Sequence, residues 1–299
     1  MRILAVLNQD GGTLKTTDLG IFTEEIKQSF VHAGHQIEIN ISKGAAIVGD
    51  LEKAVSRPDI ECVLAGGGDG TVSAAAHQCW KHKKVLAVLP AGTMNLFART
   101  LKIPLDISEA LPALANGVVR KADLASLNGR SFLHQVSLGI QPKVITERKT
   151  IDYNSRAGKI MASMKALLNT LSTPPSFEVE LTIDNNAAER KRLSMIAISN
   201  NPHSEGHMPY PDTIDAGKMG VYTSPKTDFA DNLRMIKDLF VGNWSQSPDL
   251  SVTTAGTVTL NFVNHKSSDR IAIDGELVKL EKTMEVKSHP KALKVLMPE

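Results

Sequence analysis

Residues 62–72 read Cys62-Val63-Leu64-Ala65-Gly66-Gly67-Gly68-Asp69-Gly70-Thr71-Val72, which is the most informative segment of the chain. The apolar run before Gly66 has the composition of a buried strand, and a helical pattern begins at Thr71. Glycines let the backbone take positive φ and approach a ligand closely, and a helix N-terminus adds a positive field. The stretch therefore predicts an anion-binding loop between a strand and a helix.

The acid inside this loop, Asp69, is unfavourable beside an anion unless a cation offsets its charge, so it indicates phosphate bound together with Mg²⁺. The loop is not a P-loop, because no Gly-Lys-Ser/Thr follows, and it is not the dinucleotide fingerprint, because Thr71 replaces the third glycine. A plain flexible connector is the alternative. Three consecutive glycines followed by Asp-Gly lose too much conformational entropy for a connector, which favours the phosphate loop.

A second turn of the same kind follows one strand–helix unit later. The strand-like run 85–89 leads into Pro90-Ala91-Gly92-Thr93-Met94-Asn95-Leu96-Phe97-Ala98-Arg99. Thr93 can donate to a phosphate and Asn95 can fix the loop, although either residue alone would be an ordinary helix N-cap. Two such turns at neighbouring strand ends are expected to face one crevice, where open α/β sheets bind ligands.

The rest of the chain divides into two parts by its pattern. Strand-like runs at 3–7, 37–41, 60–65 and 85–89 alternate with helical patterns at 21–31, 45–55, 71–82, 94–101 and 107–116, which predicts a parallel α/β sheet. We expect this domain to cover residues 1–125, completed by 290–299, because the apolar run 293–297 can return to pair with it. A β-rich domain is expected over 126–289.

This second part reads as an antiparallel sandwich or barrel. Strand-like runs at 121–127 and 132–138 flank the hairpin signal Asn128-Gly129. Further strand-like runs lie at 177–183, 193–200, 219–223, 252–262 and 270–273, and helical patterns at 158–171 and 229–241.

Composition excludes several classes of function. The 299 residues are 42% hydrophobic and 22% charged with a net charge of +2, which is typical of a globular protein without a nucleic-acid footprint. Only 4% are aromatic, so base-stacking platforms are not expected. The two cysteines, Cys62 and Cys79, lie in apolar runs without metal-ligand or redox spacing and read as small buried hydrophobes.

No targeting or spanning segment is recognisable. The apolar run at the N-terminus is too short for a signal peptide, and no stretch approaches the roughly 20 apolar residues that a spanning helix needs. We therefore expect a cytoplasmic protein whose contact with the inner face of a membrane is peripheral.

Three motifs together make the chain resemble a known family. Gly67–Thr71, the segment Leu89–Arg99 and the distant Asp274-Gly275-Glu276 resemble, in the same order, the motifs of the diacylglycerol kinase catalytic family, and within it the small bacterial YegS-like lipid kinases. The glycine loop alone would also suit NAD kinases and phosphofructokinase-like folds, whereas the 90–99 segment is far more selective. The resemblance implies a three-layer α/β domain that binds ATP, a β-sandwich that carries most of the lipid cleft, and an active site between them.

The resemblance also implies roles for individual residues. Glu276 matches the general base, and Asp69 and Asp274 would share catalytic Mg²⁺. Ser42 matches a nucleotide-binding position, although a strand-end cap explains it equally well, and Asp274-Gly275 is also a common hairpin turn. The full set implied for the nucleotide is Ser42, Gly67, Gly68, Asp69, Gly70, Thr71, Val72, Ser73, Ala74, Thr93 and Asn95.

Two positions depart from the family pattern. Leu96 stands where the family commonly has an acid after the motif asparagine, which removes one acid from the network around Mg²⁺ and the acceptor. The family's regulatory metal loop often reads Asp-Asp-Gly, and here one of the two acids is missing. The residues of that loop implied as metal ligands are Thr213, Asp215, Ala216 and Lys218.

Two weaker signals favour structural interpretations. A basic amphipathic stretch could dock on anionic lipid headgroups, but a helix that packs its apolar stripe on the sheet is the favoured interpretation. His203, His207, Tyr210 and Asp212 lack zinc spacing and read as a polar loop. The members of the amphipathic stretch are Arg148, Lys149, Arg156, Lys159 and Lys165, with Ile160, Met161, Met164, Leu167, Leu168 and Leu171.

Three functional hypotheses remain at this point. The leading one is an ATP- and Mg²⁺-dependent lipid kinase that acts at the membrane surface on a diacylglycerol, phosphatidylglycerol, ceramide or sphingoid-type hydroxyl. The second is an NAD kinase-like enzyme with a soluble acceptor, although the expected Asn-Glu/Asp motif about 50 residues on is not found. The third is a nucleotide- and lipid-binding protein without turnover, which Leu96 makes conceivable. The oligomeric state stays open, with a homodimer among the alternatives.

Overall fold

The predicted strand–loop–helix unit forms the centre of the first of two lobes. A computed structural model describes residues 1–299 except 152–155, 226, 265 and 267–268, and omits the side chains of Arg156, Ala157, Lys159 and Phe240. Strand β3 (Cys62–Gly67) and its neighbour β4 (Val85–Pro90) are buried at every position, as expected for parallel strands covered on both faces. Helix α3 (Asp69–His82) begins two residues after β3 ends.

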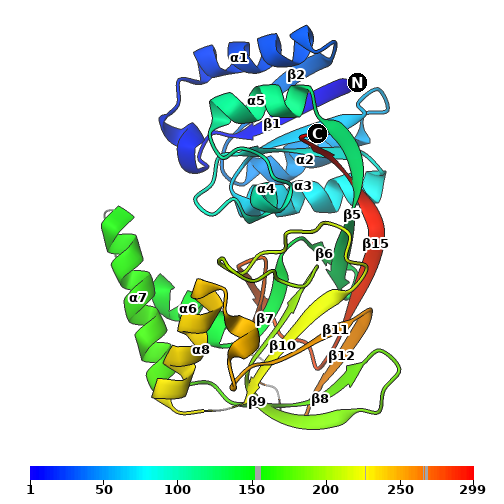
Figure 1. The fold of residues 1–299 in the computed structure, drawn as a ribbon. Helices are drawn as coiled ribbons and strands as arrows, with labels where there is room; N and C mark the ends of the chain where they lie inside the picture. Colours follow the sequence, from blue (N-terminus) through cyan, green and yellow to red (C-terminus); the bar gives the residue numbers. More distant parts are fainter. Residues whose placement is uncertain (152–155, 226, 265, 267–268) are drawn as a thin grey trace.

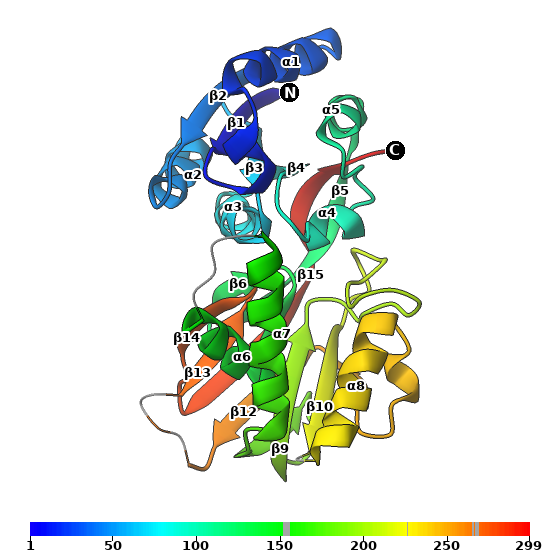
Figure 2. The same cartoon turned by 90° about the vertical axis from the view of Figure 1, so that its left-hand side faces the viewer.

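The first lobe is a three-layer α/β structure. Its parallel strands lie in the order β2-β1-β3-β4, followed by the end of β15. Helices α1 and α5 cover one face of this sheet, and α2 and α3 cover the other (Figure 2). The remaining elements of the lobe are β1 (Arg2–Asn8), the 3-10 turn η1 (Gly12–Thr16), α1 (Leu19–His32), β2 (Gln36–Ser42), α2 (Ala46–Ser56), α4 (Leu96–Thr100) and α5 (Ile107–Ala115).

The second lobe is mainly antiparallel sheet with three helices on one side (Figure 1). Its strands follow the order β14-β13-β7-β9-β8-β12, and β10 and β11 extend from β9. The elements are β6 (Arg130–Phe132), β7 (Gln135–Gly139), α6 (Ile140–Lys149), α7 (Arg156–Ser172), β8 (Phe177–Ile183), β9 (Glu189–Ser199), β10 (Met219–Pro225), α8 (Phe229–Val241), the 3-10 turn η2 (Trp244–Gln246), β11 (Ser251–Ala255), β12 (Thr257–Phe262), β13 (Arg270–Ile273) and β14 (Glu276–Lys279).

Two long strands join the lobes. Strand β5 (Val118–Leu127) runs antiparallel to β15 (Thr283–Met297) along most of its length, so the two form one ribbon between the lobes (Figure 1). The last residues of β15 pair in parallel with β4, with Lys294 opposite Val85. The expectation that the final apolar run returns to the first sheet is therefore confirmed.

The hydrophobic core changes along this ribbon. The buried cluster of the first lobe includes Leu124 and the end of β15, whereas Ala125 and the start of β15 belong to the cluster of the second lobe. Cys62 and Cys79 are fully buried in the first cluster, and burial raises the pKa of Cys62 to about 12. The exact domain limits at residues 125 and 289 stay a prediction.

Two local predictions are wrong, and one helix was missed. The strand expected at 132–138 is broken between β6 and β7, because the Leu133 and His134 amides donate to Asp274 instead of a neighbouring strand. The strand expected at 252–262 is split at Gly256, whose N–H donates to Asp184. Helix α6 was not predicted, since only two of its residues are buried and it lacks a helical apolar stripe.

Among the described residues, no helix has the length and apolarity needed to cross a bilayer.

Candidate active site

The two predicted glycine turns touch each other at the carboxyl ends of β3 and β4. Gly67 pairs with Pro90 across the sheet, and the Ala91 amide donates to the Gly67 carbonyl at 3.1 Å. A Cβ atom added at Gly92 would lie 2.6 Å from Cα of Gly68, so these backbones approach as closely as glycine allows. The two turns therefore contact each other directly, and no residue of the second turn lines the cavity between α3 and the second lobe, so a crevice faced by both turns stays a prediction.

Asp69 is the residue that links the turns. Its carboxylate accepts hydrogen bonds from the amides of Asn95 (3.1 Å) and Leu96 (2.8 Å), the first groups of α4. Asn95 itself has a left-handed backbone (φ 50°) and exchanges two side-chain hydrogen bonds with Gly92. Asp69 therefore caps α4 with both carboxylate oxygens, each of which accepts one amide, and 23% of its side chain remains accessible.

A buried histidine from the second lobe faces Asp69. Nε2 of His134 lies 3.5 Å from Oδ1 of Asp69, and the His134 side chain is only 10% exposed. Nε2 has no hydrogen-bond partner among the described residues, so the contact is electrostatic. Burial alone would lower the pKa of His134, but the carboxylates of Asp69 and Asp274 outweigh it and raise that pKa. Burial alone would raise the pKa of Asp69, but His134 and the two amides lower it.

This pair predicts a pH-dependent difference in stability between the wild type and His134→Asn. A raised pKa in the folded state stabilises the fold fully below the unfolded value of about 6.5, and that stabilisation is lost as pH rises through the folded pKa. We expect the wild-type advantage in free energy of unfolding to shrink from pH 6 to pH 9, measured by urea titration in EDTA.

Substitution of His77 supplies a control, because the contribution of His77 to the free energy of unfolding should change with pH in the opposite direction. Burial lowers its pKa, so its contribution should be present above pH 6.5 and should fall as pH drops below that value. An advantage over His134→Asn that stays constant across this range would show that folding does not shift the pKa of His134, and an advantage that grows with pH would show that His134 is kept neutral in the folded protein.

The Asp274-Gly275 hairpin holds the second lobe onto α3. Asp274 has φ 47° and Gly275 φ 83°, which fits a two-residue turn between β13 and β14. The Asp274 carboxylate accepts from the Ser73 hydroxyl at 2.5 Å and from three consecutive amides at 2.9, 2.9 and 3.1 Å. These three amides belong to Leu133, His134 and Gln135. Asp274 is therefore both a turn residue and a brace between lobes, and its four lone-pair positions are occupied.

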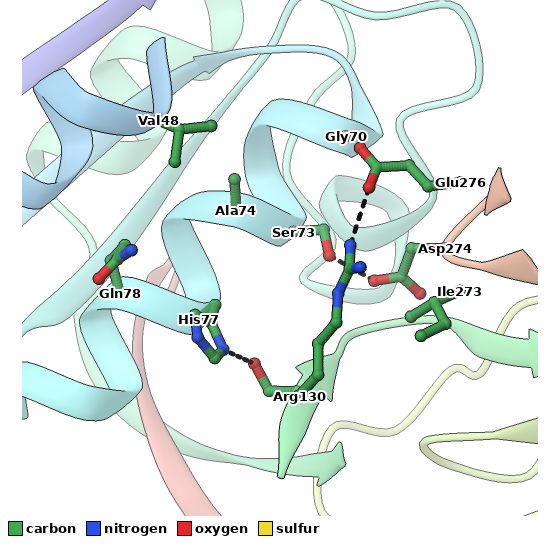
Figure 3. A pocket seen from close by; sticks show the side chains of 11 residues that line it. Val48, Gly70, Ser73, Ala74, His77, Gln78, Arg130, Ile273, Asp274 and Glu276 are labelled. Carbon is green, nitrogen blue, oxygen red and sulfur yellow. Dashed lines mark hydrogen bonds and ion pairs between the residues drawn. The ribbon is translucent and has the colours of Figure 1, made fainter. Parts of the chain in front are cut away.

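A cavity of about 250 Å³ lies between α3 and this hairpin (Figure 3). Gly70, Ser73 and Ala74 line it from α3, and Glu276 lines it from the start of β14. Oε2 of Glu276 accepts from Arg130 at 2.8 Å, with 63% of the Glu276 side chain exposed. Such a surface ion pair contributes at most about 1 kcal/mol, so an incoming ligand can displace it at small cost. The glycine loop and the distant acidic hairpin thus share one cavity.

The other predicted nucleotide residues lie around the loop. Thr71 is buried, and its hydroxyl accepts from Asn8 at 3.2 Å, while Val72 packs in the core. Thr93 is exposed. Ser42 is 2% exposed and donates to Asp50 at 2.6 Å, and it is not among the residues that line the cavity. Both interpretations of Ser42, the strand-end contact and the nucleotide contact, stay open.

The loop proposed for a regulatory metal is tied down by backbone contacts. Buried Asp123 and Asn201 accept from the amides of Gly217 (2.6 Å) and Ala216 (3.0 Å). Thr213, Asp215, Ala216 and Lys218 are all exposed. In the described part of the chain, no three His, Cys, Asp or Glu side chains group to hold a metal. A metal role for this loop would depend on backbone carbonyls and stays a prediction.

No pattern in the sequence pointed to His134 or Arg130 as residues of the site. Both lie in the second lobe and reach the site only because β5–β6 and the chain after it fold against α3. Arg130 directly follows the predicted Asn128-Gly129 turn, which was the one local signal available. His134 lies in the break between β6 and β7, a break that the alternation of apolar residues does not reveal.

Known proteins resemble this chain both in sequence and in fold. Residues 2–127 match the family model of the diacylglycerol kinase catalytic domain. The first lobe of this chain is therefore similar to the diacylglycerol kinase catalytic domain. A protein named diacylglycerol kinase in Bacillus subtilis (strain 168) is 25% identical over 259 residues, 84% of this chain and 83% of that one. A Staphylococcus haemolyticus protein with lipid kinase in its name is 25% identical over 289 residues, 91% and 89% of the two chains.

The fold extends this similarity beyond the matched domain. A crystal structure of a diacylglycerol kinase from Bacillus anthracis str. Sterne superposes with a TM-score of 0.73 at 18% identity and covers 99% of this chain and 96% of that one. The predicted fold class, an α/β domain followed by a β-rich part, is confirmed. The matched domain and the names of these relatives support the expectation of a phosphotransferase with an alcohol group as acceptor.

Proposed function

We propose that this protein transfers the γ-phosphate of ATP to a lipid hydroxyl of the diacylglycerol, phosphatidylglycerol, ceramide or sphingoid type. The observation that carries the proposal is the shared cavity, in which Gly70 and Ser73 from the phosphate loop and its helix face Glu276 from the second lobe. In this reaction the acceptor oxygen bonds to the γ-phosphorus, and the bond from that phosphorus to the β–γ bridging oxygen breaks. ADP leaves, and Glu276 takes the hydroxyl proton as general base.

The exposure of Glu276 supports its role. Its carboxylate is held by one partner, Arg130, whereas Asp274 is fully engaged by four donors. An acceptor hydroxyl entering from the second lobe can therefore reach Glu276 without breaking a buried network. Arg130, released from the pair, would lie beside the transferring phosphate and offset its negative charge.

Asp69 is the better candidate of the two predicted Mg²⁺ ligands. It keeps open acceptor positions and accessible surface, whereas Asp274 would have to release a donor. Mg²⁺ is commonly held by one or two carboxylates together with substrate phosphates and water, so one carboxylate is sufficient. When bound, the ion would neutralise charge on the transferring phosphate. Leu96 offers no acid, and Asp69 faces His134 instead of a second carboxylate.

Label transfer tests the proposal against its alternatives. The pure protein is incubated with γ-labelled ATP, Mg²⁺ and a panel of hydroxyl-bearing lipids, with NAD in a parallel reaction. We expect label on at least one lipid and none on NAD. Label on NAD alone would indicate the soluble-acceptor enzyme. ATP binding with no label on any acceptor would indicate a binding protein without turnover.

The phosphate loop itself is tested by Gly70→Ala. A Cβ atom at Gly70 meets no protein atom within 4 Å and would point into the space that the loop leaves open for a ligand. The backbone at Gly70 does not have positive φ, and alanine is favoured over glycine in a helix by about 0.5–1 kcal/mol. We expect a fold of unchanged or higher stability with at least tenfold weaker ATP binding, measured by calorimetry.

Gly49→Ala is the matched control, because Gly49 lies inside α2 and its added Cβ also meets nothing within 4 Å. Both variants should gain similar stability, and only Gly70→Ala should lose ATP affinity. Equal ATP affinity in the two variants would show that the phosphates of ATP do not bind at this part of the loop.

A further inference from the structure

Helix α3 contacts the second lobe through one stripe of its surface. Asp69, Ser73 and His77 follow one another at intervals of four residues, which places their side chains on one side of the helix. Their partners across the junction of the lobes, in the same order, are His134 at 3.5 Å, Asp274 at 2.5 Å and Ser131 at 2.8 Å. The first contact belongs to the phosphate loop and the second to the hairpin that carries Glu276. The third contact has no part in the mechanism proposed above.

This third contact holds strand β6 against α3. Strand β6 has three residues and pairs with β5 along one edge. Ser131, its central residue, is 4% exposed, and its hydroxyl meets Nδ1 of His77. Both side chains line the cavity between α3 and the hairpin. Because Arg130 directly precedes Ser131, the contact with His77 fixes the short strand from which the Arg130 side chain extends.

Arg130 gives the cavity its positive charge. Among the described residues that line the cavity, there is no lysine and no other arginine. Burial, Lys81 and Arg130 lower the pKa of His77, so the imidazole is neutral near pH 7 and adds no charge of its own. A guanidinium binds phosphate oxygens through a rigid fork of N–H groups, so its contribution depends on where the backbone holds it.

The phosphate loop and Arg130 lie on the walls of the same cavity (Figure 3). Gly70 and Ser73 line it from the first turns of α3, where a helix N-terminus attracts anions. The guanidinium of Arg130 is held by Glu276 at 2.8 Å, and 49% of the Arg130 side chain is exposed. Such an exposed pair contributes at most about 1 kcal/mol, so a phosphate group can replace the carboxylate. Arg130 therefore needs its strand, more than its ion pair, to stay in place.

From these contacts we propose that His77 is a positioning residue, which acts through Ser131 to hold Arg130 where the guanidinium binds the phosphates of ATP. The proposal rests on the ATP site proposed above. It gives the second lobe a part in nucleotide binding. Helix α3 then has two tasks, since its first turn faces the phosphates and its third turn places the cation that binds them.

A double-mutant cycle on ATP affinity is the first test. ATP binding to the full-length protein is measured by calorimetry with Mg²⁺ and without lipid. Arg130→Gln should weaken binding at least tenfold, and His77→Leu about threefold to tenfold, the scales for losing a hydrogen bond to a charged and to a neutral group. In the Arg130→Gln background, His77→Leu should cause no further loss, because no guanidinium is left to place.

Three single variants support the cycle. Ser131→Ala removes the other partner of the hydrogen bond and should weaken ATP binding as much as His77→Leu does. Asparagine offers a polar group near the place of Nδ1, so His77→Asn should keep an ATP affinity close to that of the wild type. His82→Leu is the matched control, because His82 is exposed on the same helix and does not line the cavity. It should bind ATP like the wild type.

Adenosine binding separates positioning from a general structural role. Adenosine has no phosphate, so Arg130→Gln and His77→Leu should both leave its affinity unchanged. Equal losses for ATP and adenosine would show that His77 supports the whole cavity instead of Arg130. An equal loss of ATP affinity from His77→Leu with and without Arg130 would show that His77 does not act through Arg130. Either result would overturn the proposal.

Label transfer from ATP to lipid separates this proposal from the proposed function. A wild type that phosphorylates a lipid, with Arg130 and His77 variants that bind ATP as tightly as the wild type, would overturn the positioning role and leave the kinase function intact. The expected cycle on ATP affinity with no phosphorylation of any lipid would support the positioning role and overturn the lipid kinase function. A wild type that binds no ATP would overturn both.

Discussion

Glu276→Gln should lower turnover at least ~100-fold and leave ATP affinity unchanged, because loss of a positioned general base removes about two to four orders of magnitude in rate. Glutamine has the same size but cannot accept the acceptor's proton. Glu276 belongs to the second lobe and touches α3 only across the cavity, so the phosphate loop should keep its structure. The measurements are steady-state phosphorylation of a lipid acceptor and ATP binding by calorimetry.

Glu281→Gln supplies the control for this change. Glu281 is also an exposed glutamate with one side-chain partner, Asn128 at 2.9 Å, but it lies outside the cavity. It should keep wild-type turnover. If Glu276→Gln also kept wild-type turnover, Glu276 would have no part in proton removal, and the proposed mechanism would need another base.

The second large effect is expected for Asp274→Asn, which should destabilise the protein by about 3 kcal/mol. The carboxylate accepts four hydrogen bonds through two oxygens, whereas asparagine keeps one acceptor oxygen and turns an NH₂ group towards the remaining donors. Each partly buried donor left without an acceptor costs about 1–3 kcal/mol. Asparagine tolerates the left-handed backbone at this position, so the turn itself is not strained. Urea-induced unfolding measures the loss.

Asp184→Asn provides the comparison. Asp184 also has a left-handed backbone (φ 52°) and accepts from the amides of Gly256 and Thr257, but a single oxygen accepts both. An asparagine oxygen can replace it, so the cost should stay below about 1 kcal/mol. Similar losses in the two variants would mean that the contact of Asp274 with Ser73 and the three amides does not hold the lobes together.

The Asp274 variant should also affect turnover. The Ser73–Asp274 hydrogen bond fixes the hairpin that carries Glu276 against α3, so its loss should misplace the base more than the nucleotide. We therefore expect a fall in kcat that exceeds any change in ATP affinity. This pattern would distinguish a positioning role from direct binding of Mg²⁺, which would weaken both.

Local signals in the sequence were sufficient for the phosphate loop and the parallel sheet. The completely buried β3 and β4 read as short apolar runs. The glycines of Gly66–Gly70 were also readable as a loop without side chains, which is what the close approach to Gly92 requires. The Asp274-Gly275 turn was recognisable because a two-residue hairpin needs residues that accept positive φ. These features depend on neighbours in the chain, so the chain alone determines them.

Contacts between distant segments required the tertiary structure. His134 opposite Asp69, Arg130 on Glu276 and the four donors around Asp274 join residues from 65 to 201 positions apart. Strand periodicity did not reveal the break between β6 and β7, because the amides that cause it bond to a side chain from the far end of the chain. The exposure of large apolar residues on α7, which were expected to pack on the sheet, was also hidden, since apolar spacing shows that a helix has a face but not which face the rest of the protein covers.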